Sequence, residues 1–156
     1  MGAAIHTLHV VLAGVWLGGV VFTTTVVSPA LKAMKWSEAE RIGVRSVIGK
    51  QYARVGGLNL LLLLLFAVSD GLLRGFGAVL YTECALLTAV FGLVAVHGVY
   101  FGRKLARLAA TERRTEGAEE ARALFEKRRS LQRLSLWVSW VNVLISAALA
   151  ALAVGA

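Results

Sequence analysis

Four long stretches of this chain carry almost no charge, and this pattern constrains the fold more than any other feature of the sequence. The stretches are residues 1–31, 55–73, 75–102 and 134–156. Only two acidic residues interrupt them, Asp70 in the second and Glu83 in the third. A helix of about 20 apolar residues suffices to cross the hydrocarbon of a bilayer. The pattern therefore predicts an all-α fold, a polytopic integral membrane four-helix bundle made of one domain.

The composition argues against the water-soluble classes of protein. Hydrophobic residues make up 58% of the chain, charged residues make up 17%, and the mean hydropathy is +0.71. A soluble domain of this size cannot bury so much apolar surface. The single cysteine, Cys84, cannot close an internal disulfide. The net charge of +8 does not indicate a nucleic-acid partner, because the basic residues lie between the apolar stretches, where anionic lipid headgroups are the expected partners.

The basic residues predict how the chain sits in the membrane. Of the 17 Lys and Arg residues, all but Arg74 lie in residues 32–54 and 103–133. Because segments rich in Lys and Arg stay in the cytoplasm, we expect both of these there and both chain termini outside. A glycine-containing turn at 73–77 joins the second span to the third. The expected spans are residues 4–27, 56–73, 78–101 and 134–154.

Both basic segments are expected to be helical. Ser37 and Glu40 have the spacing of a capping box, which predicts an amphipathic helix over 38–54 lying along the inner membrane surface. The third span is expected to continue into the cytoplasm and turn near Gly117, and residues 118–133 lead back into the last span. The favoured interpretation of this hairpin is a solvated pair of helices, and the alternative is a scaffold that docks a protein or anionic lipid.

Each expected span carries polar side chains on one face. Because polar groups are costly in hydrocarbon, these faces are expected to turn inward and to line a polar bundle interior. The residues of this predicted interior are Asn59, His97, Ser135, Ser139 and Asn142. The alternative is that they only join helices through hydrogen bonds. Gly14 and Gly18 have the spacing of a close helix contact, for which packing within the bundle is favoured over a homo-oligomer interface.

Four ionisable residues near the outer ends of the spans form the candidate site: His6, His9, Asp70 and Glu83. Two histidines three residues apart on a helix can face one ion, and added carboxylates suit a divalent metal such as zinc or copper. Asp70 has an alternative partner in Arg74, one turn later. Glu83 has the alternative of being held neutral or hydrogen-bonded to a histidine. A structural role is favoured, with proton or cation handling and metal capture left open.

A haem protein is the alternative from the enzyme class. His97 is expected near the inner end of the third span, whereas His6 and His9 lie near the outer end of the first, about 20 Å away along the helix axis. One iron cannot bridge that distance. This hypothesis therefore requires a haem b held by His97 alone, or by ligands from two protomers.

Several short motifs resemble a known family. They are His6-x-x-His9, Trp16-Leu17-Gly18-Gly19-x-x-Phe22, Val27-Ser28-Pro29-Ala30-Leu31, Lys50-Gln51-Tyr52 and Leu131-Gln132-Arg133-Leu134-Ser135. In these the chain resembles a bacterial four-helix family designated domain of unknown function 4149, related to animal transmembrane protein 205. It is more distantly similar to the copper-resistance CopD type and, more loosely, to the HemJ type of protoporphyrinogen oxidase. The resemblance implies a multi-pass protein of the bacterial inner membrane and supplies no established activity.

The sequence as a whole favours a non-enzymatic role. No nucleotide-binding glycine motif and no nucleophile with an evident base is present. We expect a binding, permeation or accessory module for a cation, a metal or a small solute. In this hypothesis Glu83 exchanges protons or coordinates the ion, and His6 and His9 act as ligands or proton relays.

Overall fold

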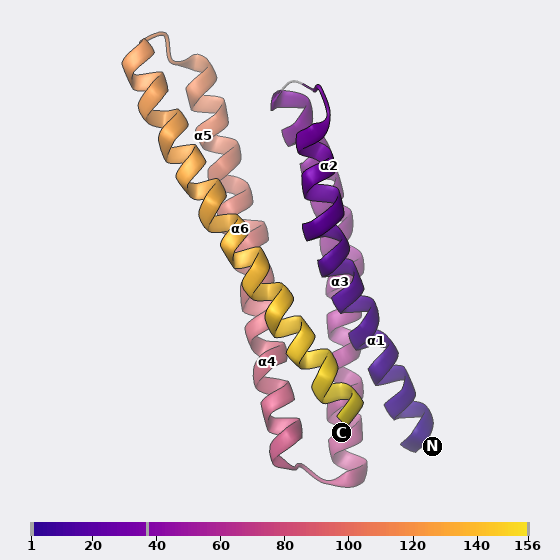
Figure 1. The fold of residues 1–156 in the computed structure, drawn as a ribbon. Coiled ribbons are helices and arrows are strands. Elements are labelled where there is room, and N and C mark those ends of the chain that lie inside the picture. The colour runs from indigo at the N-terminus through magenta and orange to yellow at the C-terminus, as the bar shows by residue number, and fades with distance from the viewer. Residues whose placement is uncertain (1, 37, 156) are drawn as a thin grey trace.

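The fold consists of four long helical rods (Figure 1). The computed structural model describes residues 2–36 and 38–155, and all regular structure in them is helical. Each rod contains a stretch long and apolar enough to cross a membrane, which confirms the predicted four-helix membrane bundle. In chain order the elements are α1 (Gly2–Phe22), the π-helical η1 (Thr23–Val27), α2 (Ser28–Ala33), α3 (Glu38–Arg74), α4 (Ala78–Ala95), the π-helical η2 (Val96–Phe101), α5 (Gly102–Arg114) and α6 (Ala118–Gly155).

Both ends of the chain and the α3–α4 turn lie at one end of the bundle, here named the terminal end (Figure 1). The α2–α3 and α5–α6 connections lie at the opposite end, here named the loop end. The α3–α4 turn needs a glycine, because Gly75 has φ +97°, a left-handed conformation that side chains with a Cβ rarely adopt. The Gly75 amide donates to the Gly71 carbonyl at 2.8 Å and closes the end of α3.

Large apolar side chains cover the outside of the bundle. Leu72, Leu144 and Val55 are about 70% exposed, at 74%, 68% and 69%. In a chain whose rods can span a bilayer, such side chains are solvated by lipid tails, while the helices satisfy the backbone hydrogen bonds internally. The protein is therefore an integral, multi-pass membrane protein.

The rods pack so that α1 and α4 face each other across the bundle. The helix α1 makes its most extensive contacts with α3 and α6, and α4 packs against α6 and α3. In Figure 1 α6 crosses in front, with α3 behind. Any group that joins α1 directly to α4 must therefore reach through the centre of the bundle.

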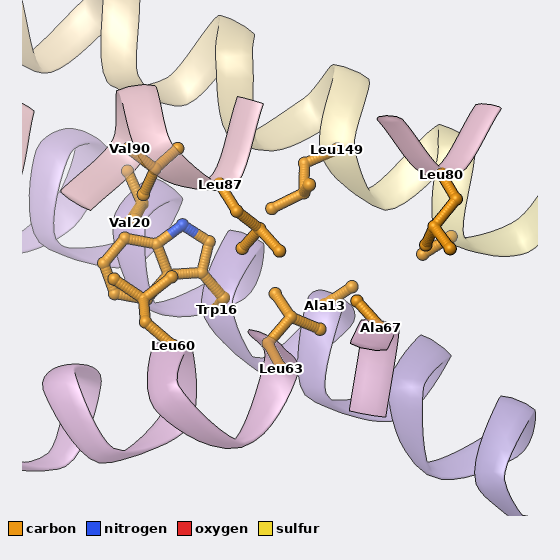
Figure 2. Close-up of a cluster of buried hydrophobic side chains, with 11 residues drawn as sticks. Ala13, Trp16, Val20, Leu60, Leu63, Ala67, Leu80, Leu87, Val90 and Leu149 are labelled. Carbon is orange, nitrogen blue, oxygen red and sulfur yellow. The ribbon is translucent and has the colours of Figure 1, made fainter. Parts of the chain in front are cut away.

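An apolar cluster fills the centre and takes side chains from all four rods (Figure 2). Leu63 from α3, Leu87 from α4 and Leu149 from α6 are fully buried, and Trp16 from α1 is 2% exposed. Because lipid tails are as apolar as leucine, burial of these side chains stabilises the bundle by close van der Waals packing rather than by escape from water. The centre of the bundle is therefore filled mainly by apolar side chains.

The amphipathic segment 38–54 differs from its prediction. It was expected as a separate helix along the membrane surface, but α3 runs unbroken from Glu38 to Arg74. At 1.5 Å per residue this helix is about 55 Å long, which exceeds a hydrocarbon thickness of about 30 Å. Its first part therefore projects beyond the bilayer along the same axis. Ser37, the predicted capping residue, lies outside the described residues.

The second hairpin confirms its prediction. The helix α5 continues the third rod to Arg114, and α6 begins at Ala118. In the first turn of α6 the Ala121 amide donates to the Gly117 carbonyl at 2.9 Å. The helix α6 then runs without a break into the last expected span. The turn that was expected near Gly117 is therefore present between α5 and α6.

The two halves of the chain share one plan. In each half a helix enters from the terminal end, passes through a π-helical segment and returns as one long helix. Three buried positions of α1 have buried counterparts in α4 at the same spacing. The pairs are His9 and Glu83, Ala13 and Leu87, and Trp16 and Val90, each 74 residues apart. The two ionisable residues therefore occupy equivalent levels in parallel helices.

Candidate functional site

A buried ionisable pair joins α1 to α4. His9 Nε2 is hydrogen-bonded to Glu83 Oε1, and the two residues are only 3% and 1% exposed. His9 lies on the buried stripe of α1 with Ala13 and Trp16, and Glu83 lies on that of α4 with Leu87. Positions three, four and seven residues apart share one face of a helix, so the spacing of these stripes points both ionisable side chains into the bundle.

The pair has two protonation arrangements of equal net charge. One is an imidazolium beside a carboxylate, and the other is a neutral imidazole accepting a hydrogen bond from a protonated Glu83. Both hold a single proton between the two side chains. Removing that proton, or adding a second, leaves one uncompensated charge in the interior, which is costly by several kcal/mol.

The second ring nitrogen of His9 is not used within the described part of the chain. His9 Nδ1 is buried and has no hydrogen-bond partner there. A buried polar atom without a partner destabilises a fold by roughly 1–3 kcal/mol. The pair thus retains hydrogen-bonding capacity that the surrounding side chains do not satisfy.

Asp70 and His6 do not join this pair. Asp70 lies within 3.0 Å of Arg74 Nε one turn later on α3, so its charge is compensated locally. His6 is half-buried, one turn before His9. Among the described residues no three His, Cys, Asp or Glu side chains form a group that could hold a metal. Of the four predicted site residues, the structure brings together only His9 and Glu83.

The residues of the predicted polar interior are not joined into one interior. The Asn59 amide donates to the Leu12 carbonyl at 3.1 Å, and the Ser139 hydroxyl donates to the Ser135 carbonyl at 3.1 Å on its own helix. Asn142 is half-buried, and its Oδ1 atom has no partner in the described chain. Leucines of the apolar cluster fill the centre among these groups. The Asn59 bond joins α3 to α1, as in the helix-joining alternative, whereas the Ser139 bond lies within α6 and joins no helices.

His97 lies apart from the His9–Glu83 pair. It belongs to η2, and at 1.5 Å per residue its 14-residue separation from Glu83 amounts to about 21 Å along the rod. Its ring is half-buried with its centroid 6.0 Å from that of Phe101, and its Nδ1 atom is buried without a partner in the part of the chain described. The chain therefore does not bring His97 and His9 to one iron.

Trp16 joins α1 to two neighbouring rods. Its indole Nε1 donates to the Ser146 hydroxyl at 2.9 Å, which joins α1 to α6 inside the bundle. Its ring also packs against Tyr52, at a centroid distance of 6.0 Å. A Cβ on Gly56 would lie 3.1 Å from the Trp16 ring, and one on Gly19 would lie 3.2 Å from the Tyr52 hydroxyl. These two glycines make room for the aromatic pair.

Gly14 and Gly18 correct one expectation. The interpretation favoured from the sequence was packing within the bundle, but both glycines are exposed and a Cβ on either would meet nothing within 4 Å. They lie on the face of α1 opposite the buried stripe of His9 and Trp16. The spacing of two glycines does not reveal which face of a helix is covered.

A second ion pair, in which only the arginine is fully buried, joins the two helices of the α5–α6 hairpin. Arg128 is 6% exposed, its Nε lies 2.8 Å from Glu112 Oε2, and its guanidinium carbon lies 5.3 Å from the centre of the Phe125 ring. The sequence indicated only a solvated charge run here. The sequence holds a weak signal for this contact, because Arg128 shares a helical face with Leu124 and Leu131.

Comparison with known proteins identifies the family. The family model for a domain of unknown function, DUF4149, matches residues 11–114, well over half of the chain. The match includes Glu83 and begins just after His9. No curated protein and no solved structure gives a significant match. This four-rod, multi-pass membrane protein therefore belongs to the DUF4149 family.

Proposed function

We propose that this chain is a non-enzymatic membrane module that binds a cation, in its simplest form a proton, at the His9–Glu83 pair. The observation that carries this proposal is the burial, inside the bundle, of two ionisable side chains that are hydrogen-bonded to each other. Ionisable residues inside membrane helices are costly, and they mark proton or ion sites by default.

Protonation of the pair is coupled to helix packing. The pair links α1 with α4, which otherwise face each other across the bundle. When the pair gains or loses a proton, an uncompensated charge arises in a low-dielectric interior, and the direct contact is weakened. The rods then separate at this level or admit water or a counter-ion. In this way the proton occupancy of one site alters the arrangement of the whole bundle.

The packing supports binding rather than an open pore. Leu63, Leu87 and Leu149 are fully buried at the centre, beyond the pair. An ion path through them requires the rods to move apart. With the orientation that the basic segments predict, the pair lies toward the outer side of the membrane, so the module responds to protons that arrive from outside.

The test is a pH titration of the Glu83 carboxyl group by infrared difference spectroscopy on the protein in lipid nanodiscs. We expect a protonated-carboxyl band that titrates in the wild type and disappears in Glu83→Gln. In His9→Ala the same band should persist at a shifted frequency, because the carboxyl group has lost its hydrogen-bond partner. Asp70→Asn is the matched control and should leave the band unchanged. If the wild type and Glu83→Gln show the same titrating bands, the proposal is overturned.

A divalent metal is the alternative cation at the same pair. Calorimetric titration with Zn²⁺ or Cu²⁺ separates the two cases. Binding that is lost in both His9→Ala and Glu83→Gln assigns the pair to a metal, with further ligands supplied from outside the pair. Absence of binding, together with the infrared titration, assigns it to protons.

A haem-binding function receives less support from the geometry. A metal-ligating histidine almost always donates its other ring N–H to a fixed acceptor, which orients the ring. His97 Nδ1 has no such partner in the described chain. A visible spectrum decides this alternative, because a Soret band that His97→Ala abolishes would establish the haem.

A further inference from the structure

A shallow concavity on the exposed face of α6 gathers three cations. Its volume is about 630 Å³. Arg128, in the middle of this run, is buried and paired with Glu112, whereas the basic residues around it are exposed. The concavity is lined by Ala123, Glu126, Lys127, Arg129, Ser130 and Arg133. Three basic groups against one carboxylate make it a site for an anion.

An apolar track continues from the concavity along the same face. Arg133, Trp137, Trp140 and Leu144 follow one another at intervals of four, three and four residues, which keeps them on one side of a helix. Trp137, Trp140 and Leu144 are 72%, 52% and 68% exposed. Tryptophan is enriched where a helix passes from hydrocarbon to headgroups. The face therefore changes from basic to aromatic to aliphatic, which matches the phosphate, the glycerol-ester region and the acyl chain of a phospholipid in turn.

The depth of the concavity matches the headgroup layer. Arg133 is the last charged residue before the uncharged stretch from Leu134. Lys127 lies six residues earlier, about 9 Å along the helix axis. Headgroups add roughly 5–8 Å to each side of the hydrocarbon core. A phosphate at this level has the same depth as all three cations, which line the concavity.

We propose that this face of α6 binds one phospholipid with an anionic headgroup. Arg129 and Arg133 bind the phosphate, Lys127 attracts it from the rim of the concavity, and the Ser130 hydroxyl donates to one of its oxygens. One acyl chain lies along Trp137, Trp140 and Leu144. Because the apolar track extends from the basic site, a membrane lipid fits this face better than a free phosphate does. The inference is independent of the His9–Glu83 pair.

The test is native mass spectrometry of the full chain in detergent, titrated with phosphatidylglycerol or phosphatidylcholine of equal chain length. We expect phosphatidylglycerol to bind roughly 25-fold more tightly, because two net positive charges each contribute a factor of about five. In the triple variant Lys127→Gln, Arg129→Gln, Arg133→Gln the preference should fall to about twofold or less. Trp137→Ala should weaken both lipids equally, since it shortens the apolar track.

The matched control removes the same charge from another rod. Arg45, Lys50 and Arg54 are exposed basic residues of α3, and their replacement by Gln should leave the preference for phosphatidylglycerol intact. Equal loss in the two triple variants means diffuse attraction and overturns the site. Displacement of the lipid by inorganic phosphate assigns the concavity to a free phosphate and overturns the lipid assignment. Because all six replaced residues are exposed, unchanged thermal melting is the expected check on folding.

Discussion

At the scale of single residues, the bundle depends on a few positions where side chains of different rods meet without spare room. Gly56 is such a position, because a Cβ there would lie 3.1 Å from the Trp16 ring, which is itself 2% exposed and held by Ser146. Gly18 is the opposite case, with nothing within 4 Å of an added Cβ. Two glycines that look alike in the sequence thus have different consequences.

We predict that Gly56→Ala destabilises the bundle by roughly 1–3 kcal/mol, because the Trp16 ring cannot move away from the added methyl group. The measurement is unfolding in mixed micelles followed by tryptophan fluorescence. Gly18→Ala is the control and is expected to change the free energy of unfolding by no more than about 0.5 kcal/mol. Equal effects of the two substitutions would show that the Trp16–Tyr52 contact does not set the distance between α1 and α3.

The His9–Glu83 pair provides the second residue-scale prediction. Glu83→Leu leaves a neutral imidazole buried without a partner and should cost roughly 1–3 kcal/mol of unfolding free energy. Adding His9→Leu removes the orphaned group, so the double variant should recover much of that loss. The same mixed-micelle unfolding measures the cycle, with Asp70→Asn as a control outside the pair. Additive effects of the two leucine substitutions would mean that the residues do not interact.

At the scale of the elements, the sequence predicts helices far better than it predicts their contacts. Nearly charge-free runs of the right length locate all four rods. A single segment that crosses a bilayer must satisfy its own backbone hydrogen bonds, and a helix does so. The prediction of a surface helix over 38–54 was wrong for a physical reason. An amphipathic pattern is equally compatible with a helix along the membrane surface and with a straight extension of the span, which α3 has. The expectation that polar faces turn inward holds for Glu83. That Glu83 pairs with His9 and not with Asp70 depends on which rods meet across the bundle, and periodicity does not show this.

The α5–α6 hairpin offers a prediction at this scale. Arg128 is nearly buried against Glu112, so Glu112→Gln leaves a poorly compensated guanidinium and should loosen the hairpin by roughly 1–3 kcal/mol. Hydrogen exchange should then increase in α5 and in the first turns of α6, while the central apolar cluster stays protected. Glu119→Gln removes an exposed carboxylate from the same hairpin and serves as the control. Faster exchange in both variants would attribute the change to net charge alone.

At the scale of the whole molecule, the even number of rods determines which parts of the chain share one side of the membrane. The chain starts, reverses between α3 and α4, and finishes at one end, so every residue of the terminal end shares one side of the membrane (Figure 1). The His9–Glu83 pair lies in the half of the bundle nearer that side. In the proposed function, the side on which the terminal end lies therefore decides which compartment supplies the proton. Because the basic residues gather at the loop end, we expect that end inside and the terminal end outside.

Cysteine labelling tests that orientation. In a Cys84→Ser background, single cysteines replace exposed Phe76 at the α3–α4 turn and exposed Lys35 at the loop end. A membrane-impermeant maleimide added to intact cells should label the cysteine at 76 and not the one at 35, because the segments rich in Lys and Arg stay inside. Permeabilised cells should label both, which shows that each site is reachable. The reverse pattern in intact cells would turn the bundle over, and the buried pair would then respond to the cytoplasm.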